Sequence, residues 1–287
     1  MASILVTGAS RGIGRATCIS LARAGHRVFA TMRDPANAPE LGALAISESL
    51  PIIVSAMDVD SDDSVRGGVR DIIAQHGPLG VLVNNAGIER RGSVEELALE
   101  EFRAVMETNY FGALRCMQAV LPGMRKRGSG WIINVTSVAG RISSSPLGPY
   151  AASKFALEAI SEALAQEVKA FGIKVAVVQP GIINTDLANA ITADSDASVY
   201  PHGRRLAGMF AASLKTPTGP ELVGNKIREI IESDLPQFRH PVGPDAAPFL
   251  AWRAAMTDEQ WIDWGASDDA SWYEAVERDF GLNARPT

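Results

Sequence analysis

Residues 3–14 of the chain read SILVTGASRGIG, a short apolar run followed by a glycine-rich turn. A helical pattern continues to about Ala24, and this strand–turn–helix unit predicts an α/β fold. Such a turn exposes backbone N–H groups and the positive end of a helix, which suits a pyrophosphate, although its G-x-x-x-G-x-G spacing differs from the common G-x-G-x-x-G. A plain tight turn is the alternative. The cofactor hypothesis assigns contacts to Gly8, Ser10, Arg11, Gly12, Ile13 and Gly14.

The same alternation of strand and helix patterns continues along the chain. Apolar runs predict strands at 28–30, 52–54, 81–83, 131–135 and 175–178, and a seventh at 238–242 that Pro241 shortens. Helical periodicity predicts a helix beginning near Ser61 and Asp62, one opened by the capping-box spacing at 93–96 and running to Arg127 with a break near Asn109, and others at 150–171, 206–214 and 220–232. The nearly continuous apolar runs favour parallel strands covered on both faces. We therefore expect an α/β protein with a Rossmann-type, doubly wound parallel sheet of about seven strands in one domain, residues 1–243.

The last part of the chain differs in composition from the rest. From Arg239 onward, 49 residues hold nine Asp and Glu against four Lys and Arg, so nearly all of the net charge of −6 lies there. Four of the five tryptophans lie there too, at Trp252, Trp261, Trp264 and Trp272. Aromatic anchors of this kind dock one segment onto another. We expect residues 244–287 to form an acidic, helical tail that packs on its own domain or on a neighbouring subunit. The tail would then cover either the interface between subunits or the opening of the substrate pocket.

Composition excludes several classes of protein. The 287 residues are 46% hydrophobic and 21% charged, which excludes intrinsic disorder, and with 2 Cys a disulfide-rich scaffold is excluded too. The acidic balance argues against nucleic-acid binding. No apolar run reaches the roughly 18 residues of a membrane span, and no leader precedes the first strand, so we expect a cytoplasmic protein. The four histidines are isolated and predict no metal site.

The end of the second predicted strand indicates which cofactor fits. An acidic residue there would bind the adenosine ribose of NAD, but the sequence has Met32 and Arg33. Arg33 and Arg11 could together hold a 2′-phosphate through charge-assisted hydrogen bonds. The sequence therefore favours NADP(H). NAD(H) remains the alternative, because Asp34 could take the ribose-binding position if the strand ended one residue later.

Taken together, these motifs resemble the classical short-chain dehydrogenase/reductase family. The glycine turn matches its Thr-Gly-x-x-x-Gly-x-Gly signature, residues 84–87 match Asn-Asn-Ala-Gly, and residues 180–185 match Pro-Gly-x-x-x-Thr. The resemblance covers Ser3 to about Thr185, with a weaker match near 238–243. It implies cofactor contacts by Asp58, Val59, Asn85, Ala86, Gly87, Pro180, Gly181, Ile183 and Thr185, and a catalytic set of Asn109, Ser137, Tyr150 and Lys154, of which Tyr150 and Lys154 also contact the cofactor.

The catalytic chemistry can also be argued from spacing. Tyr150 and Lys154 are four residues apart in a predicted helix, so they share one face. We expect the Lys154 ammonium to lower the pKa of the Tyr150 phenol from its usual value near 10, so that it can exchange a proton with a substrate oxygen. Ser137 would hold that oxygen. Asn109 would anchor, through its backbone carbonyl, a water that links Lys154 to solvent.

The substrate side carries a weaker signal. The segment 186–218 corresponds to the family's substrate flap, and the motifs look most like the hydroxysteroid and retinol dehydrogenase branch. This implies an oxidoreductase that interconverts a bulky, apolar secondary alcohol and its ketone. An NAD-dependent alcohol dehydrogenase and a non-catalytic NADP-sensing protein are the alternatives. The family resemblance also implies a homodimer or homotetramer that pairs through 109–127 and 150–171. The expected substrate-lining residues are Ser144, Leu147, Leu187, Met209 and Phe210.

Overall fold

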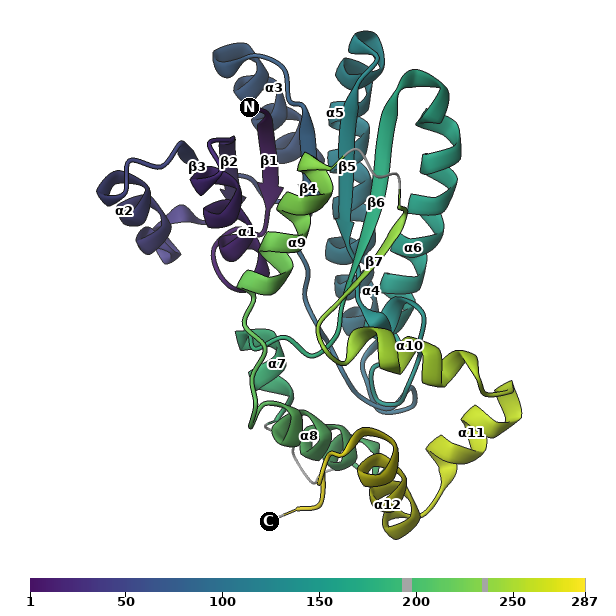
Figure 1. Ribbon diagram of the computed structural model, residues 1–287. Coiled ribbons are helices and arrows are strands. Elements are labelled where there is room, and N and C mark those ends of the chain that lie inside the picture. Colours follow the sequence, from purple (N-terminus) through teal and green to yellow (C-terminus); the bar gives the residue numbers. More distant parts are fainter. Residues whose placement is uncertain (193–197, 234–236, 287) are drawn as a thin grey trace.

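The computed structural model describes residues 1–192, 198–233 and 237–286. Residues 193–197 of the predicted flap and Thr287 of the predicted tail lie outside the described residues. The described chain forms a parallel sheet in the order β3-β2-β1-β4-β5-β6-β7, which confirms the predicted fold class (Figure 1). The strands are β1 (Ser3–Thr7), β2 (Arg27–Met32), β3 (Ile52–Ala56), β4 (Val81–Asn84), β5 (Gly130–Val135), β6 (Ile173–Pro180) and β7 (Arg239–Val242).

Helices cover both faces of this sheet because each central strand is apolar on both sides. In β1, Ile4 and Val6 pack towards one face and Leu5 towards the other. The first face is covered by α1 (Gly12–Arg23), α2 (Pro39–Ser47) and α9 (Glu221–Glu232), and the second by α3 (Asp62–His76), α5 (Gly112–Arg127) and α6 (Gly148–Val168). The strand order reverses between β1 and β4, which is where doubly wound sheets bind ligands.

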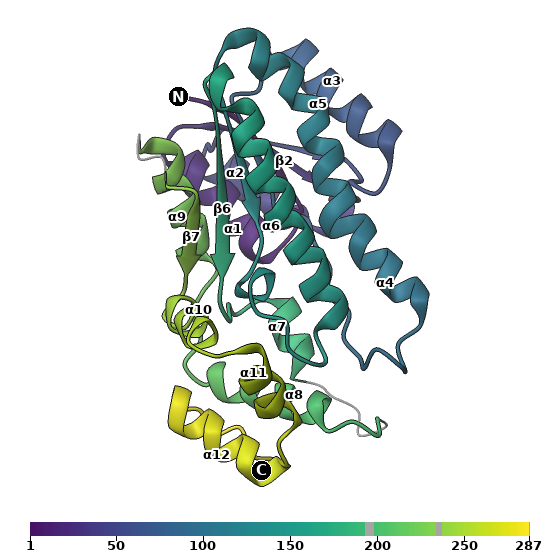
Figure 2. The same ribbon diagram turned by 90° about the vertical axis from the view of Figure 1, so that its right-hand side faces the viewer.

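A further layer lies beyond the carboxyl ends of the strands. It contains α7 (Asp186–Ile191) and α8 (His202–Ser213) from the flap segment, and α10 (Ala246–Ala254), α11 (Asp258–Ala266) and α12 (Asp269–Phe280) from the tail. Figures 1 and 2 show these helices gathered at one end of the molecule, away from the N-terminus. In the described part of the chain, no helix is both long enough and apolar enough to cross a lipid bilayer.

One local prediction needs correction, and another is confirmed. The helix expected to open at the capping-box spacing of residues 93–96 begins instead at Leu99, as α4 (Leu99–Met106). The Glu96 carboxylate accepts hydrogen bonds from Ser93 and Ser198, so it joins two loops rather than capping a helix. The break expected near Asn109 is a π-helical turn, Glu107–Phe111, between α4 and α5. Helices α2 and α7 were not predicted from the sequence. Helix α8 begins at His202, four residues before the predicted start at Leu206.

Candidate active site

The start of α6 places Tyr150 and Lys154 one helical turn apart, on the same side. The Lys154 Nζ atom lies 5.6 Å from the centre of the Tyr150 ring and donates a hydrogen bond to the Val135 carbonyl at 3.0 Å. The Lys154 side chain is therefore fixed between the end of β5 and the tyrosine. Lys154 is only 4% exposed, and burial lowers its pKa to about 8.

Ser137 follows β5 and faces the same tyrosine. Its hydroxyl accepts a hydrogen bond from the Ala139 N–H at 3.1 Å and caps the short 3-10 turn Val138–Gly140. A hydrogen bond between Ser137 and the Tyr150 side chain lowers the pKa of the phenol. Ser137, Tyr150 and Lys154 are thus brought together from two elements that are adjacent in space.

The balance of effects on Tyr150 differs from the expectation. Burial is the largest effect and raises the pKa of Tyr150 to about 12; the charge of Glu89 adds to the increase, and only Ser137 opposes it. The expectation that Lys154 lowers the pKa of Tyr150 is therefore wrong: the pKa is raised, and burial is the main cause. Burial also lowers the pKa of Lys154 to about 8, so above that pH little positive charge is left beside the phenol. At neutral pH the phenol is protonated and is a proton donor.

Asn109 lies in the π-helical turn and supports the site from behind. Its side-chain amide donates to the Ile88 carbonyl and to the Ser153 hydroxyl, both at 2.9 Å, and its oxygen accepts from the Ile88 N–H at 2.8 Å. The side chain therefore ties the segment after β4 to α6. Asn109 does not line the central cavity. The water relay through its backbone carbonyl stays a prediction.

The glycine turn after β1 is held in place by Asn85, the residue that directly follows β4. The Asn85 side-chain amide donates to the carbonyls of Thr7 and Gly8, at 2.9 and 3.0 Å. Gly8 has a φ of +65° and Gly12 of +55°, conformations that other residues rarely adopt. A Cβ atom at Gly14 would collide with the Gly8 carbonyl and the Asn85 amide. Because its glycines have no side chains, this turn leaves backbone N–H groups open to the cavity, which suits a dinucleotide phosphate group.

A cavity of about 380 Å³ connects the glycine turn with Tyr150 and continues to the tail. It runs past the carboxyl ends of the strands, where the order of the sheet reverses. Among the predicted site residues, only Gly14 and Asn109 are absent from its lining. The predicted residues that line it are Gly8, Ser10, Arg11, Gly12, Ile13, Arg33, Asp58, Val59, Asn85, Ala86, Gly87, Ser137, Ser144, Leu147, Tyr150, Lys154, Pro180, Gly181, Ile183, Thr185, Leu187, Met209 and Phe210.

At the adenosine end, the two predicted arginines and Asp34 are placed differently. Arg11 and Arg33 line the cavity, and the Arg11 guanidinium forms an exposed ion pair with Asp186 of α7 at 3.3 Å. Asp34 does not line the cavity. Its carboxylate accepts a hydrogen bond from the Ala36 N–H at 2.9 Å and caps a 3-10 turn. Arg11 and Arg33 therefore border the cavity at this end, whereas Asp34 does not.

At the substrate end, the tail contributes aromatic residues that the sequence reading did not assign to the pocket. Trp261 and Trp264 stack at 5.1 Å, and Trp252 meets Trp264 edge-on at 5.0 Å. The Trp261 ring N–H donates to the Ser143 carbonyl at 3.0 Å, which joins the tail to the loop before α6. The clustering of tryptophans past residue 250 was the available signal. The tail residues that line the cavity are Phe249, Trp252, Trp261, Trp264 and Phe280.

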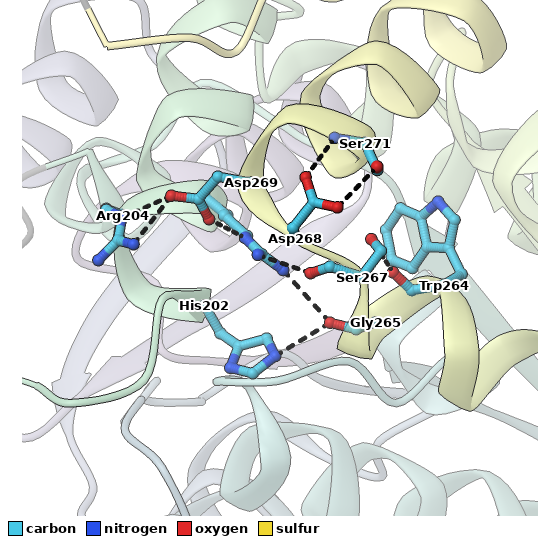
Figure 3. Close-up of polar contacts among 9 residues, drawn as sticks. His202, Arg204, Trp264, Gly265, Ser267, Asp268, Asp269 and Ser271 are labelled. Carbon is cyan, nitrogen blue, oxygen red and sulfur yellow. Dashed lines mark hydrogen bonds and ion pairs between the residues drawn. The ribbon is translucent and has the colours of Figure 1, made fainter.

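Polar contacts fix the tail to the flap (Figure 3). Asp269, at the start of α12, forms ion pairs with Arg204 at 2.8 Å and with Arg205 at 2.7 Å, both from α8. Arg205, whose side chain is 4% exposed, also donates to the carbonyls of Gly265 and Ser267. The sequence indicated the acidity of the tail but not this partner.

Glu89 is a further cavity residue that the sequence reading missed. Its side chain is 7% exposed, and its Oε2 atom pairs with Arg91 at 3.2 Å. Burial is the main cause that raises the pKa of its carboxyl group. Within the described ranges, no group of three or more His, Cys, Asp or Glu side chains is arranged to hold a metal ion.

Comparison with known proteins agrees with this geometry. The family model of the short chain dehydrogenases matches residues 2–196. A 3-ketodihydrosphingosine reductase from Bacteroides thetaiotaomicron is 38% identical over 84% of this chain and 87% of its own, and retinol dehydrogenase 8 from Bos taurus is 34% identical over 88% and 85%. A crystal structure of a short-chain dehydrogenase from Streptomyces avermitilis superposes with a TM-score of 0.77, at 33% identity, covering 93% of this chain and 98% of that one.

Proposed function

Because the chain belongs to the short-chain dehydrogenase family, whose oxidoreductases act on CH–OH groups with a nicotinamide cofactor, we propose that it uses NADP(H) to reduce bulky, apolar ketones. The observation that carries the reaction type is the cluster of Tyr150, Ser137 and Lys154 at one point of a cavity that also follows the glycine turn. A bound nicotinamide supplies the hydride in such a site.

The protein's own residues then handle the oxygen and the proton. Ser137 and Tyr150 present hydroxyl groups side by side, so both can hydrogen-bond to a carbonyl oxygen. As negative charge develops on that oxygen, the protonated Tyr150 can donate its proton. Since the pKa of Tyr150 is raised to about 12, its protonated form persists across the physiological range, which favours the direction of ketone reduction.

The preference for NADP(H) is supported by charge at the adenosine end. Arg11 and Arg33 line the cavity there, and Asp34 is engaged in capping a turn. A 2′-phosphate would gain charge-assisted hydrogen bonds from the guanidinium groups, whereas the two ribose hydroxyls of NAD would find no lining carboxylate at position 34.

The preference for an apolar ketone is supported by the chamber beyond Tyr150. Leu147 packs in a buried cluster with Leu206 and Phe210 of the flap. Trp252 and Trp264 of the tail line the same cavity. An apolar substrate that packs against these aromatic side chains gains about 25 cal/mol of binding free energy for each Å² of apolar surface removed from water. The proposed domain arrangement follows: residues 1–243 hold the cofactor and catalytic groups, the flap of 186–218 borders the substrate, and the tail of 244–287 completes the chamber.

The test is to measure oxidation of NADPH and of NADH with a panel of steroid, retinoid and aryl ketones, in the wild type and in Arg33→Ala. We expect kcat/KM to favour NADPH in the wild type and the NADPH/NADH ratio to fall about tenfold or more in the variant, since a charge-assisted hydrogen bond is lost. Arg66→Ala, on the exposed face of α3, is the matched control and keeps the wild-type ratio. Equal ratios in the wild type and Arg33→Ala would contradict the NADP(H) proposal. NADPH binding without turnover of any ketone would favour a sensor instead.

A further inference from the structure

We propose that Glu158 is a positioning residue for the reaction: its buried carboxylate holds the ends of β5 and β6 so that the Ser137 hydroxyl stays beside Tyr150. This inference rests on the proposed function, which gives Ser137 and Tyr150 their roles at the substrate oxygen. It starts from a buried ion pair behind the catalytic group that the proposed mechanism does not use.

Glu158 lies one helical turn after Lys154 on α6, and its side chain is 4% exposed. It does not line the cavity, so it acts on the reaction only through its neighbours. Its Oε1 atom accepts hydrogen bonds from the Thr136 hydroxyl at 2.8 Å and from the Gln179 side-chain amide at 3.0 Å. Its Oε2 atom accepts from the Arg239 Nε–H at 2.9 Å. The carboxylate thus ties α6 to the ends of β5 and β6 and to β7.

Two of these partners stand directly beside the segments that hold Ser137. Thr136 precedes Ser137 in the chain, and its N–H donates to the Val178 carbonyl of β6 at 2.8 Å. Gln179 precedes Pro180, whose carbonyl oxygen lies 3.4 Å from the Ser137 hydroxyl. A shift of Thr136 or Gln179 would therefore carry the Ser137 hydroxyl with it.

The turn that begins at Ser137 also packs against Glu158. Gly140 is the last residue of this 3-10 turn, and its N–H donates to the Ser137 carbonyl at 2.9 Å. A Cβ atom at Gly140 would lie 2.9 Å from the Glu158 Cγ atom and 3.2 Å from the Lys154 carbonyl oxygen. Glu158 therefore meets the chain on both sides of Ser137.

A carboxylate suits this role because its hydrogen bonds fix directions as well as distances. A buried ion pair is often no more stabilising than well-packed apolar residues of the same volume. Charge-assisted hydrogen bonds are, however, short and strong, and one carboxylate accepts them from three strands at once. Catalysis is sensitive to such positions, since a misplacement of about 1 Å can lower a rate on the order of a hundredfold.

The experiment is a double-mutant cycle between Glu158 and Ser137. Glu158→Gln keeps the volume of the side chain but turns one acceptor into a donor, so the bonds from Thr136, Gln179 and Arg239 cannot all persist. We expect it to lower the single-turnover rate of acetophenone reduction by NADPH about tenfold, while the affinity for NADPH stays at the wild-type value. In a Ser137→Ala background the same change should cost little, because the group that Glu158 positions is gone.

Glu162→Gln is the matched control. Glu162 lies one turn further along α6 and pairs with the same Arg239 at 2.7 Å, but its side chain is 56% exposed. This variant should keep the wild-type rate. An equal loss of rate from Glu158→Gln in both backgrounds would overturn the inference, because a merely structural role reduces the amount of active enzyme whether or not Ser137 is present. An unchanged rate in Glu158→Gln would overturn it too.

Thr136→Val serves if Glu158→Gln does not fold. Valine keeps the shape of threonine and removes the hydroxyl that donates to Glu158, so it should show the same dependence on Ser137.

Crystal structures give a readout that does not depend on turnover. In Glu158→Gln or Thr136→Val, the Ser137 hydroxyl should be displaced from its place beside Tyr150 by about 0.5 Å or more. An undisplaced hydroxyl would overturn the inference and leave the reductase activity standing. If the wild type reduced no ketone, the proposed function would fail, and the position of the hydroxyl would still decide whether Glu158 holds it.

Discussion

The residues that surround the Tyr150 phenol act against one another. Burial and Glu89 favour the neutral phenol, whereas Ser137 favours the phenolate. Burial also lowers the pKa of Lys154 to about 8, which limits how strongly its charge can act above that pH. A protonated phenol suits ketone reduction, in which it donates. Alcohol oxidation needs the phenolate, so the two directions should respond oppositely to pH.

This opposition predicts the pH profile of the reverse reaction. With 1-phenylethanol and NADP, kcat/KM should keep increasing above pH 9, because the phenolate fraction grows about tenfold per pH unit below a pKa of about 12. Ser137→Ala should move this limb to higher pH, since it removes the hydrogen bond that lowers the pKa. Tyr150→Phe should lower turnover at least a hundredfold while NADPH still binds. A plateau that begins near pH 7 in the wild type would contradict the raised pKa.

At this scale, the sequence predicted which residues meet but not the energies between them. The spacing of Tyr150 and Lys154 places both on one helix face, and the fold brings Ser137 to them. The direction of the Tyr150 pKa shift could not be read from spacing, because it depends on how deeply the surrounding layers bury the phenol. Glu89 was missed for a related reason: its partner Arg91 also donates a hydrogen bond to the Ala190 carbonyl of α7, about a hundred positions away.

At the scale of elements, the glycine turn couples β1, α1 and β4. Gly14 lies in the first turn of α1, where a side chain would displace the Asn85 amide that holds the turn. The hydrogen bonds that join the end of β1 to the residue after β4 therefore require a glycine at position 14. Gly42, in α2, has no heavy atom within 4 Å of where a Cβ would lie. The two glycines provide a matched pair.

We predict that Gly14→Ala destabilises the protein by about 1–3 kcal/mol and abolishes NADPH binding, because the turn must shift to avoid overpacking. Gly42→Ala should be neutral or stabilise by up to about 1 kcal/mol, since alanine is favoured in a helix. Chemical unfolding gives the free energies, and quenching of tryptophan fluorescence gives NADPH affinity. Wild-type affinity in Gly14→Ala would show that the turn is not part of the cofactor site.

The elements that were predicted well are those with strong local signals. Ser61 caps α3 as expected, and its hydroxyl accepts from the Ser64 N–H at 3.3 Å. The central strands follow their apolar runs. The signal at 93–96 misled because Glu96 binds Ser198, a residue about a hundred positions away. Local patterns cannot reveal a competing partner at that distance.

At the scale of the whole molecule, the tail pairs with α8 of the flap beside the cavity, where we propose the substrate chamber. The sequence left open whether the tail covers the substrate mouth or an interface between subunits, and the described residues place three of its tryptophans in the cavity. Phe111, in the π-helical turn before α5, and Phe155, in α6, are both more than one third exposed. The homodimer or homotetramer that pairs through these helices stays a prediction, which light scattering can test.

The ion pairs of Asp269 provide the last prediction. Arg204 and Arg205 lower the pKa of the Asp269 carboxyl, so its contribution to stability is complete above the usual carboxyl pKa near 4 and is lost as the pH falls through the lowered value. Asp269→Asn should therefore lower the thermal midpoint at pH 7 and remove this part of the acid dependence. It should also raise KM for large apolar ketones, since α12 no longer holds α8 closely.

Asp258→Asn is the control for this experiment, because Asp258 pairs with Arg253 within the tail and not with the flap. It should leave KM and the thermal midpoint close to the wild type. Thermal unfolding between pH 3 and 8 and Michaelis constants for a small and a large ketone measure both effects. If Asp269→Asn changed stability but left KM for both ketones unchanged, docking of the tail on the flap would not shape the substrate chamber. A change in KM confined to the large ketone would show that this polar contact sets the size of the chamber.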